Sequence, residues 1–461
     1  MWSFWGIFLA LIAYRSTLVA GTVNIEVNPS QTNSGISDDY GTNAVVYDLD
    51  KLATNPPKIL VYLPGTDGKV QGGMKFLEAA ASSGYLVVGL AYINKTPMGV
   101  YCRKRPLEVE CYWDSRRNVI QGVQYPYSGP TVKKEDSVVW RLYNMLTWIR
   151  DSCTSCDPVV NSLITNVITA EAPYQPPMYG SGIVWKNITF SGHSQGAGHV
   201  TAIGYLYSVS RVIALSGCTD FPIGPDLNYR WESALVNQKN TSANRFYGLV
   251  AYNEEVADLI HDNWEATKFV GSLQGVPGSN GGVASSYAHS HQLCSTLPNN
   301  CWFAHGSSGN DDRLRDTWTY MLTENFGTKS DAPQSCTLDP CNKGFEMAVL
   351  RLMVGISTVL PVLSTIIFHF CYRRINKNDG RRVCFGSTIV SLVVSCGLAL
   401  IIMWQYRQNA WPRVGNTVIF FLLVMFGVSA LNVAVLWYNY ISRRSEREPR
   451  TEMSSNYAVV A

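Results

Sequence analysis

The pentapeptide Gly192-His-Ser-Gln-Gly196 constrains the fold of this 461-residue chain more than any other feature. A run of apolar and β-branched residues, 183–190, precedes it, and a run of small residues, 197–204, follows it. These patterns predict a strand that turns directly into a helix. The backbones crowd together at such a turn, and glycine has no Cβ atom to clash there. We therefore expect Ser194 at the exposed tip of the turn, next to the positive end of the helix dipole.

The neighbouring segments alternate between strand and helix patterns. Apolar, β-branched runs predict strands over 58–63, 85–92, 211–216 and 245–251, with a last short strand at 291–294. Helical spacing of apolar residues predicts helices over 73–83, 135–151 and 312–325. This order predicts an α/β fold, a mostly parallel sheet with helices on both faces. Such sheets carry their functional sites beyond the carboxyl ends of the strands.

With this context, residues 55–325 resemble the α/β-hydrolase superfamily, and Gly192–Gly196 is the sharpest motif of the resemblance. The resemblance implies that Ser194 is a nucleophile and that an acid and then a histidine follow it in the chain. A serine hydroxyl needs such a base because it is a weak nucleophile alone.

Among the histidines downstream of the serine, His289, His291 and His305 lie at a suitable distance. We favour His305, because the segment 303–307 has the pattern of a loop between the last strand and the closing helix, where the family places its base. His291 is the alternative base, although it stands where the last strand is expected to start.

The acid is expected after a strand between the serine and the histidine. Glu254 follows the strand at 245–251, the commoner location in the family, and we favour it; Asp258 and Asp220 are the alternatives. The acid would orient the imidazole and stabilise its protonated form. The resemblance assigns the oxyanion-hole donors to the backbone N–H of Gln195 and to that of Gly65 or Thr66.

Composition excludes several other classes. Charged residues make up 15% of the chain and the net charge is +3, and no basic stretch with interleaved aromatic residues suggests a nucleic-acid partner. The sequence has no P-loop or dinucleotide fingerprint, and its histidines lack metal-ligand spacing with carboxylates. We therefore expect neither a cofactor nor a metal.

The chain ends predict a membrane protein. Residues 1–20 have the apolar core and small-residue end of a secretory signal peptide. Within 346–442, three apolar runs at 352–370, 383–404 and 414–442 are each long enough to cross a bilayer. The loop 371–382 and the tail 443–461 are rich in arginine, which predicts that both are cytosolic. An extracytoplasmic domain, 21–330, and a stalk, 331–345, would then precede the spans.

Cysteines and sequons agree with an extracytoplasmic domain. Close spacing suggests disulfides 102–111, 153–156, 294–301 and 336–341, which would leave Cys218 over. Asn94, Asn187 and Asn240 head Asn-x-Ser/Thr sequons for N-glycosylation.

Together these features predict a membrane-anchored serine hydrolase of a plasma membrane or endomembrane. It would act on small-molecule or lipid esters through an acyl-enzyme on Ser194. The alternatives are a non-catalytic receptor or adhesion module on the same fold, because fold does not fix function, and a transacylase.

Overall fold

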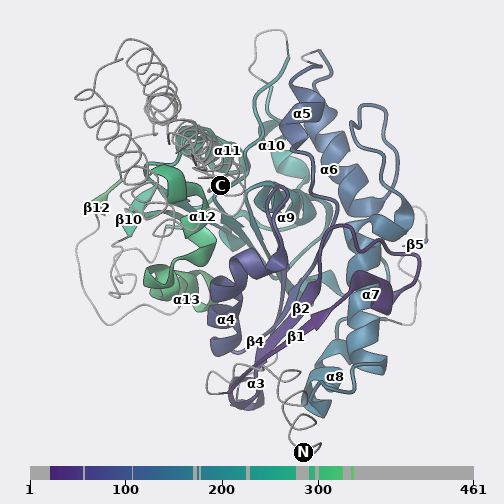
Figure 1. Ribbon diagram of the computed structural model, residues 1–461. Helices are drawn as coiled ribbons and strands as arrows, with labels where there is room; N and C mark the ends of the chain where they lie inside the picture. Colours follow the sequence, from purple (N-terminus) through teal and green to yellow (C-terminus); the bar gives the residue numbers. More distant parts are fainter. Residues whose placement is uncertain are drawn as a thin grey trace, which may run out of the picture. The chain divides into compact units, whose positions relative to one another are not determined.

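A ten-stranded sheet lies at the centre of the part of the chain that the structure describes (Figure 1). The structure is a computed structural model, and the described residues are 21–54, 58–105, 107–169, 174–175, 178–224, 229–276, 290–295, 301–324 and 334–336. The strand order is β1-β2-β4-β3-β7-β8-β9-β11-β10-β12. The strands are β1 (Thr22–Val27), β2 (Asn43–Asp48), β3 (Lys58–Leu63), β4 (Tyr85–Gly89), β7 (Ile188–His193), β8 (Arg211–Leu215), β9 (Phe246–Ala251), β10 (Gln274–Val276), β11 (Gln292–Ser295) and β12 (Gln334–Ser335).

The strands from β4 to β10 in this order are all parallel, whereas β1 and β2 at one edge and β12 at the other are antiparallel to their neighbours. The prediction of an α/β fold with a mostly parallel sheet is confirmed. The central strands are continuous apolar runs because helices cover them on both sides. All six residues of β9, for example, are buried.

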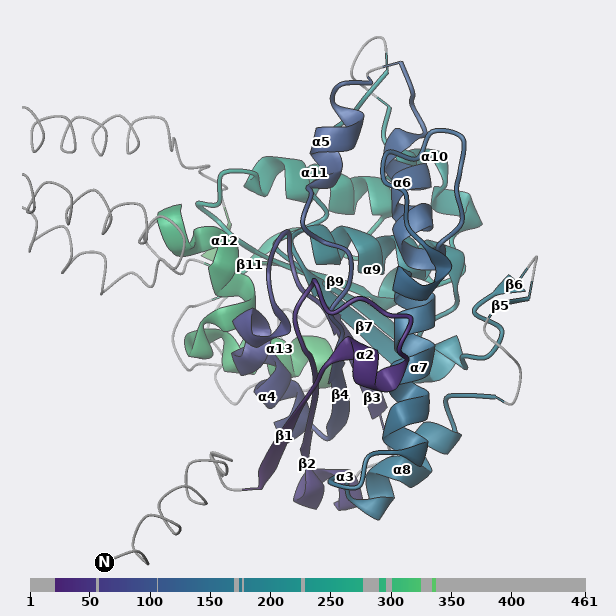
Figure 2. The ribbon, with the colours of Figure 1, turned by 45° about the vertical axis from the view of Figure 1, so that its right-hand side comes forward.

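Alternate side chains of β3 enter two separate cores. Ile59, Val61 and Leu63 pack into a core with α6 (Cys111–Gln121), α7 (Val138–Asp151), α9 (Gln195–Leu206) and α11 (Ala257–Thr267). Leu60 and Tyr62 pack on the other side with α4 (Met74–Ser82) and α13 (Arg315–Thr323). Figure 2 shows α7 and α4 on opposite sides of the sheet. The sheet is therefore the middle of three layers.

Six further α-helices lie in the described residues. They are α2 (Pro29–Thr32), α3 (Leu49–Thr54), α5 (Met98–Cys102), α8 (Pro158–Thr165), α10 (Trp231–Ala234) and α12 (Cys301–Asn310); a two-stranded sheet pairs β5 (Tyr174–Gln175) with β6 (Met178–Tyr179). α5, α6 and α10 lie together at the upper end of the molecule in Figure 2.

Two local expectations were wrong. The segment 303–307, expected to be a loop, lies inside α12, so His305 is on a helix. Its Gly-Ser-Ser-Gly stretch has low intrinsic helix propensity, and Trp318 Nε1, which donates to Ser308 O at 2.7 Å, holds this stretch against α13. The expected stalk at 331–345 contains β12, whose pairing with β10 extends the globular domain beyond residue 330.

The disulfide predictions were right for two bridges and wrong for two. Cys102–Cys111 and Cys153–Cys156 are bonded as expected. Cys294, however, pairs with Cys336 instead of residue 301, and Cys336 therefore cannot pair with residue 341. The reason is the sheet: β10 lies between β11 and β12 and brings the two cysteines together across 42 residues of sequence. Cys218 is free and buried, as expected.

Within the described residues, no helix has the length and apolar character needed to cross a bilayer. The expected signal peptide at 1–20, the three expected spans in 346–442 and the tail 443–461 all lie outside the described residues.

Candidate active site

Ser194 occupies the turn between β7, which ends at His193, and α9, which begins at Gln195. Its backbone angles, φ 55° and ψ −117°, are rare for a residue with a side chain, and strained residues of this kind cluster at active sites. Its N–H donates to Leu215 O at 2.9 Å, which ties the turn to β8.

The two glycines of the motif are required by close backbone contacts. A Cβ atom on Gly192 would lie 2.4 Å from the carbonyl carbon of Gly196, and one on Gly196 would lie 2.1 Å from Leu63 O. Both distances are far below any van der Waals contact. The strand–turn–helix that the sequence predicted is therefore present, with the serine at its tip.

Glu254 and His305 form a hydrogen-bonded pair near this turn. His305 Nδ1 contacts Glu254 Oε1, and because a carboxylate accepts, the Nδ1 nitrogen carries the proton and leaves Nε2 free to accept one. Glu254 Oε2 accepts a second bond from the buried Ser216 hydroxyl at 2.7 Å.

These contacts decide the charge of Glu254, which is 1% exposed. Burial raises the pKa of the carboxyl, but the charge of His305 and the hydrogen bonds from His305 and Ser216 outweigh burial and leave the pKa below its usual value. Glu254 is therefore an anion at neutral pH, as an imidazole-orienting acid must be.

His193, which the sequence did not suggest as a base, holds His305 from the other side. Its Nε2 lies 2.6 Å from His305 O, and since a carbonyl can only accept, Nε2 is the donor. Burial, reinforced by the charge of His305, lowers the pKa of His193 to about 4. His193 is therefore neutral at pH 7, and it links the residue next to Ser194 directly to the backbone of His305.

The structure provides no hydrogen bond from Ser194 Oγ to His305, whose ring reaches Glu254. Such bonds are often long in ligand-free hydrolases and shorten when substrate binds. The 4.8 Å between the ring centroids of His193 and His305 places the imidazole beside the turn.

The alternative candidates lie elsewhere. Asp220 is buried behind the turn and is held by Arg116 and Trp231. Asp258 is exposed on the first turn of α11. His291 precedes β11, at the amino end of the strands, where it stacks on Tyr247 with 3.9 Å between ring centroids. Residue 289 lies outside the described residues.

The expected oxyanion-hole residues lie against the nucleophile. A Cβ atom on Gly65 would come within 3.0 Å of Ser194 Cβ, so the loop after β3 contacts the turn. Thr66 Oγ1 donates to the side-chain Oε1 of Gln195 at 2.9 Å, which joins the two segments. Gln195 is the first residue of α9, where backbone N–H groups lack a partner within the helix.

A buried polar cluster lies behind α9. Arg116 donates two hydrogen bonds to the Asp220 carboxylate, from Nε at 2.6 Å and from Nη2 at 2.5 Å. Its Nη1 donates to Gln195 O at 3.3 Å. Cys218, Asp220 and Glu232 come close enough together for a metal ion. The Arg116 guanidinium already neutralises Asp220, however, and Cys218 Sγ donates to Glu232 at 3.4 Å. The cluster therefore fits a salt-bridge network better than a cation site.

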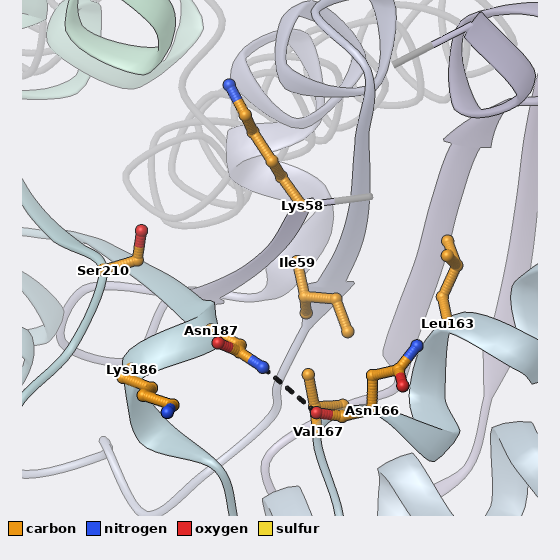
Figure 3. A pocket seen from close by; sticks show the side chains of 8 residues that line it. All are labelled: Lys58, Ile59, Leu163, Asn166, Val167, Lys186, Asn187 and Ser210. Atoms are coloured by element: carbon orange, nitrogen blue, oxygen red, sulfur yellow. Dashed lines mark hydrogen bonds between the residues drawn. The ribbon is translucent and has the colours of Figure 1, made fainter. Parts of the chain in front are cut away.

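A pocket lies near the amino ends of β3 and β7 (Figure 3). Ser194 follows the carboxyl end of β7, at the opposite end of the strand. The lining residues are Lys58, Ile59, Leu163, Asn166, Val167, Lys186, Asn187 and Ser210. Asn187 Nδ2 donates to Asn166 O at 3.1 Å across it.

The three sequons differ in accessibility. Asn187 and Asn240 are exposed, whereas Asn94 is 2% exposed. The Nδ2 nitrogens of Asn94 and Asn240 each donate two hydrogen bonds to backbone carbonyls, so burial is what distinguishes these two residues. A sequon specifies local sequence and not burial, so the sequence did not indicate that Asn94 is buried.

No protein-family model matches this chain, and no curated protein matches it significantly.

Proposed function

We propose that this protein is a serine hydrolase of the carboxylic-ester class that acts through an acyl-enzyme on Ser194. The observation that carries the proposal is the convergence of the strained Ser194 turn with the buried Glu254–His305 pair. A buried, ionised glutamate that accepts from Nδ1 of a histidine beside an elbow serine is hard to explain by stability alone, because burying the carboxylate is unfavourable.

The proposed chemistry follows from the tautomer. His305 Nε2 takes the Ser194 proton as Oγ attacks the ester carbonyl carbon, and Glu254 stabilises the imidazolium. The oxyanion accepts from the N–H of Gln195 and from the loop at Gly65 and Thr66. The imidazolium gives the proton to the leaving alcohol. Water, deprotonated by His305, then attacks the acyl carbon, and the imidazolium returns its proton to Ser194 Oγ as the acid leaves.

The test is labelling with a fluorophosphonate, which phosphonylates activated serines. The full-length chain should be labelled, and Ser194→Ala should not. Ser191→Ala is the matched control, because Ser191 belongs to the same strand but its buried Oγ donates to Ile213 O at 3.1 Å. Equal labelling of the wild type and Ser194→Ala, or none of either, would contradict the proposal. An unlabelled but stably folded wild type would favour the non-catalytic receptor alternative.

A product assay separates hydrolysis from transacylation. Incubated with a short-chain p-nitrophenyl ester, a hydrolase releases free acid in step with p-nitrophenol. A transacylase given an alcohol or amine acceptor would release the phenol with little free acid.

We also propose that the domain is extracytoplasmic and anchored to a membrane by the apolar runs within 346–442. The Cys102–Cys111, Cys153–Cys156 and Cys294–Cys336 disulfides and the exposed sequons at Asn187 and Asn240 support an oxidising, glycosylating compartment. In sealed microsomes, protease should digest the tail 443–461 and leave the domain intact. Digestion of the domain and protection of the tail would contradict this orientation.

A further inference from the structure

The loop Pro64–Gly68, after β3, is a tight turn beside the nucleophile. Gly68 N donates to Gly65 O at 3.0 Å, and Asp67 adopts a φ of 52°. The sequence of the loop does not indicate whether its N–H groups point toward Ser194. Bonds from the chain segment that follows β4 fix the carbonyl groups of the loop, and with them the planes of the peptides that carry its N–H groups.

Asn94 makes three hydrogen bonds to this loop. Its Nδ2 donates to Gly65 O at 2.7 Å and to Gly68 O at 2.8 Å, and its backbone carbonyl accepts from Asp67 N at 2.8 Å. Nearby, the Tyr92 hydroxyl donates to Pro64 O at 2.9 Å.

These carbonyls share peptide planes with the expected oxyanion donors. In a trans peptide the C=O and the following N–H point in opposite directions. The bond to Gly65 O therefore orients the N–H of Thr66, and the bond to Pro64 O orients the N–H of Gly65. Asn94 acts on the first of these peptides and Tyr92 on the second.

We propose that Asn94 is a positioning residue for the oxyanion hole and that its Asn-Lys-Thr sequon stays unglycosylated for this reason. The positioning role rests on the proposed hydrolase function. A glycan on Nδ2 would replace one of its two protons, so the nitrogen could no longer donate to Gly65 O and Gly68 O together. The burial of Asn94 leaves no room for the sugar.

The test compares two variants of the full-length chain made in a eukaryotic secretory pathway. Asn94→Asp keeps the shape of the side chain but turns a carboxylate toward two carbonyl oxygens. With a p-nitrophenyl ester we expect kcat to fall about 10²-fold, the scale of a small misplacement at a reaction centre, with KM changed little. Thr96→Val is the control: it destroys the sequon, keeps Asn94, and should leave both kcat and electrophoretic mobility unchanged.

The thermal unfolding temperature of each variant shows whether its loss of kcat is accompanied by a general loss of structure. If Asn94→Asp does not fold, Tyr92→Phe, which removes one hydroxyl, should still lower kcat about 10-fold, the scale of one neutral hydrogen bond. Mass analysis of wild-type tryptic peptides should find Asn94 unmodified.

Wild-type kcat in Asn94→Asp, or in Tyr92→Phe if Asn94→Asp does not fold, would overturn the positioning role, and a glycan on Asn94 would overturn the whole proposal. A wild type that fluorophosphonate does not label would remove the hydrolase function itself. A labelled wild type with an unaffected Asn94→Asp would remove only the positioning role.

Discussion

Glu254 Oε1 and His305 Nδ1 meet although 51 residues separate them in the chain. β9 and β11 are parallel neighbours, and the segments after them deliver the acid and the helix that carries the imidazole to the same edge of the sheet. The pair is thus a product of the sheet order and not of any local motif.

Removing the charge of Glu254 should disable the base. We expect Glu254→Gln to lower kcat about 10³- to 10⁴-fold, because the amide favours the wrong imidazole tautomer and cannot stabilise the imidazolium. Ser216→Ala, which removes the 2.7 Å bond to Oε2 and the 2.8 Å bond to Ser308 Oγ but keeps the carboxylate, should lower kcat about 10-fold. Steady-state ester hydrolysis measures both, and the role of Glu254 is wrong if Glu254→Gln loses less activity than Ser216→Ala.

The turn should not tolerate a methyl group at Gly196. Gly196→Ala places a Cβ atom 2.1 Å from Leu63 O, so we expect a loss of unfolding free energy of about 3 kcal/mol or more, or no folded protein. Gly72→Ala is the matched control, because its added Cβ meets no atom within 4 Å. Chemical denaturation of the two variants makes the comparison, and equal stabilities would contradict the close approach.

Removing one partner of the buried ion pair behind α9 should destabilise the protein more than replacing both partners. Asp220→Ala leaves the Arg116 guanidinium buried without its carboxylate and should cost about 3–5 kcal/mol of unfolding free energy. The double variant Arg116→Met with Asp220→Leu should recover most of this loss. The double variant should still be less active than the wild type, because the Arg116 bond to Gln195 O is also lost. A double variant less stable than Asp220→Ala alone would contradict this account.

The contribution of Glu232 to stability should fall as the pH rises from mildly acidic values to about 8. Burial, followed by the charge of Asp220, raises the pKa of this carboxyl to about 8. Between its usual pKa and about 8 the folded chain binds more protons at Glu232 than the unfolded chain, so this contribution to stability is present in acid and is lost as the pH rises through 8.

The variant Glu232→Gln cannot ionise at this position. Its unfolding free energy relative to wild type should therefore increase steadily from pH 5 to pH 8.5. The same substitution at exposed Glu110 is the control. A pH-independent difference between Glu232→Gln and wild type would refute the assignment.

Disulfide mapping tests the bridge between Cys294 and Cys336 and, with it, the position of β12 at the edge of the sheet. Non-reducing digestion should yield a peptide that joins Cys294 to Cys336. Replacing both cysteines with serine should lower the unfolding free energy by about 4 kcal/mol, the scale for a loop of this length. A peptide that joins 294 to 301 would contradict β12 as well as the bridge.

Local patterns predicted the centre of this fold well. β3, β8 and β9 are buried on both faces, so their apolar runs are continuous and end close to the expected residues. Ser194 and Glu254 could be selected because each follows directly from such a strand. His305 was selected for its position after the last strand, although its helix was not foreseen.

Long-range pairing could not be predicted. β1 and β2 are held by antiparallel contacts at the sheet edge, and their sequences do not identify that partner. The roles of His193 and Asn94 depend on what faces them in space. A histidine inside the motif and an asparagine inside a sequon gave no indication of the carbonyl groups that each of them contacts.

The Cys294–Cys336 bridge also has a mechanical consequence. β12 is only two residues long, and alone it would peel from the edge of the sheet under a small force. The covalent bond passes any tension arriving through the chain beyond residue 336 to β11, which is flanked by strands on both sides. A pull on the chain beyond residue 336 would therefore act on β11, the strand that precedes α12 and His305, and not on β12 alone.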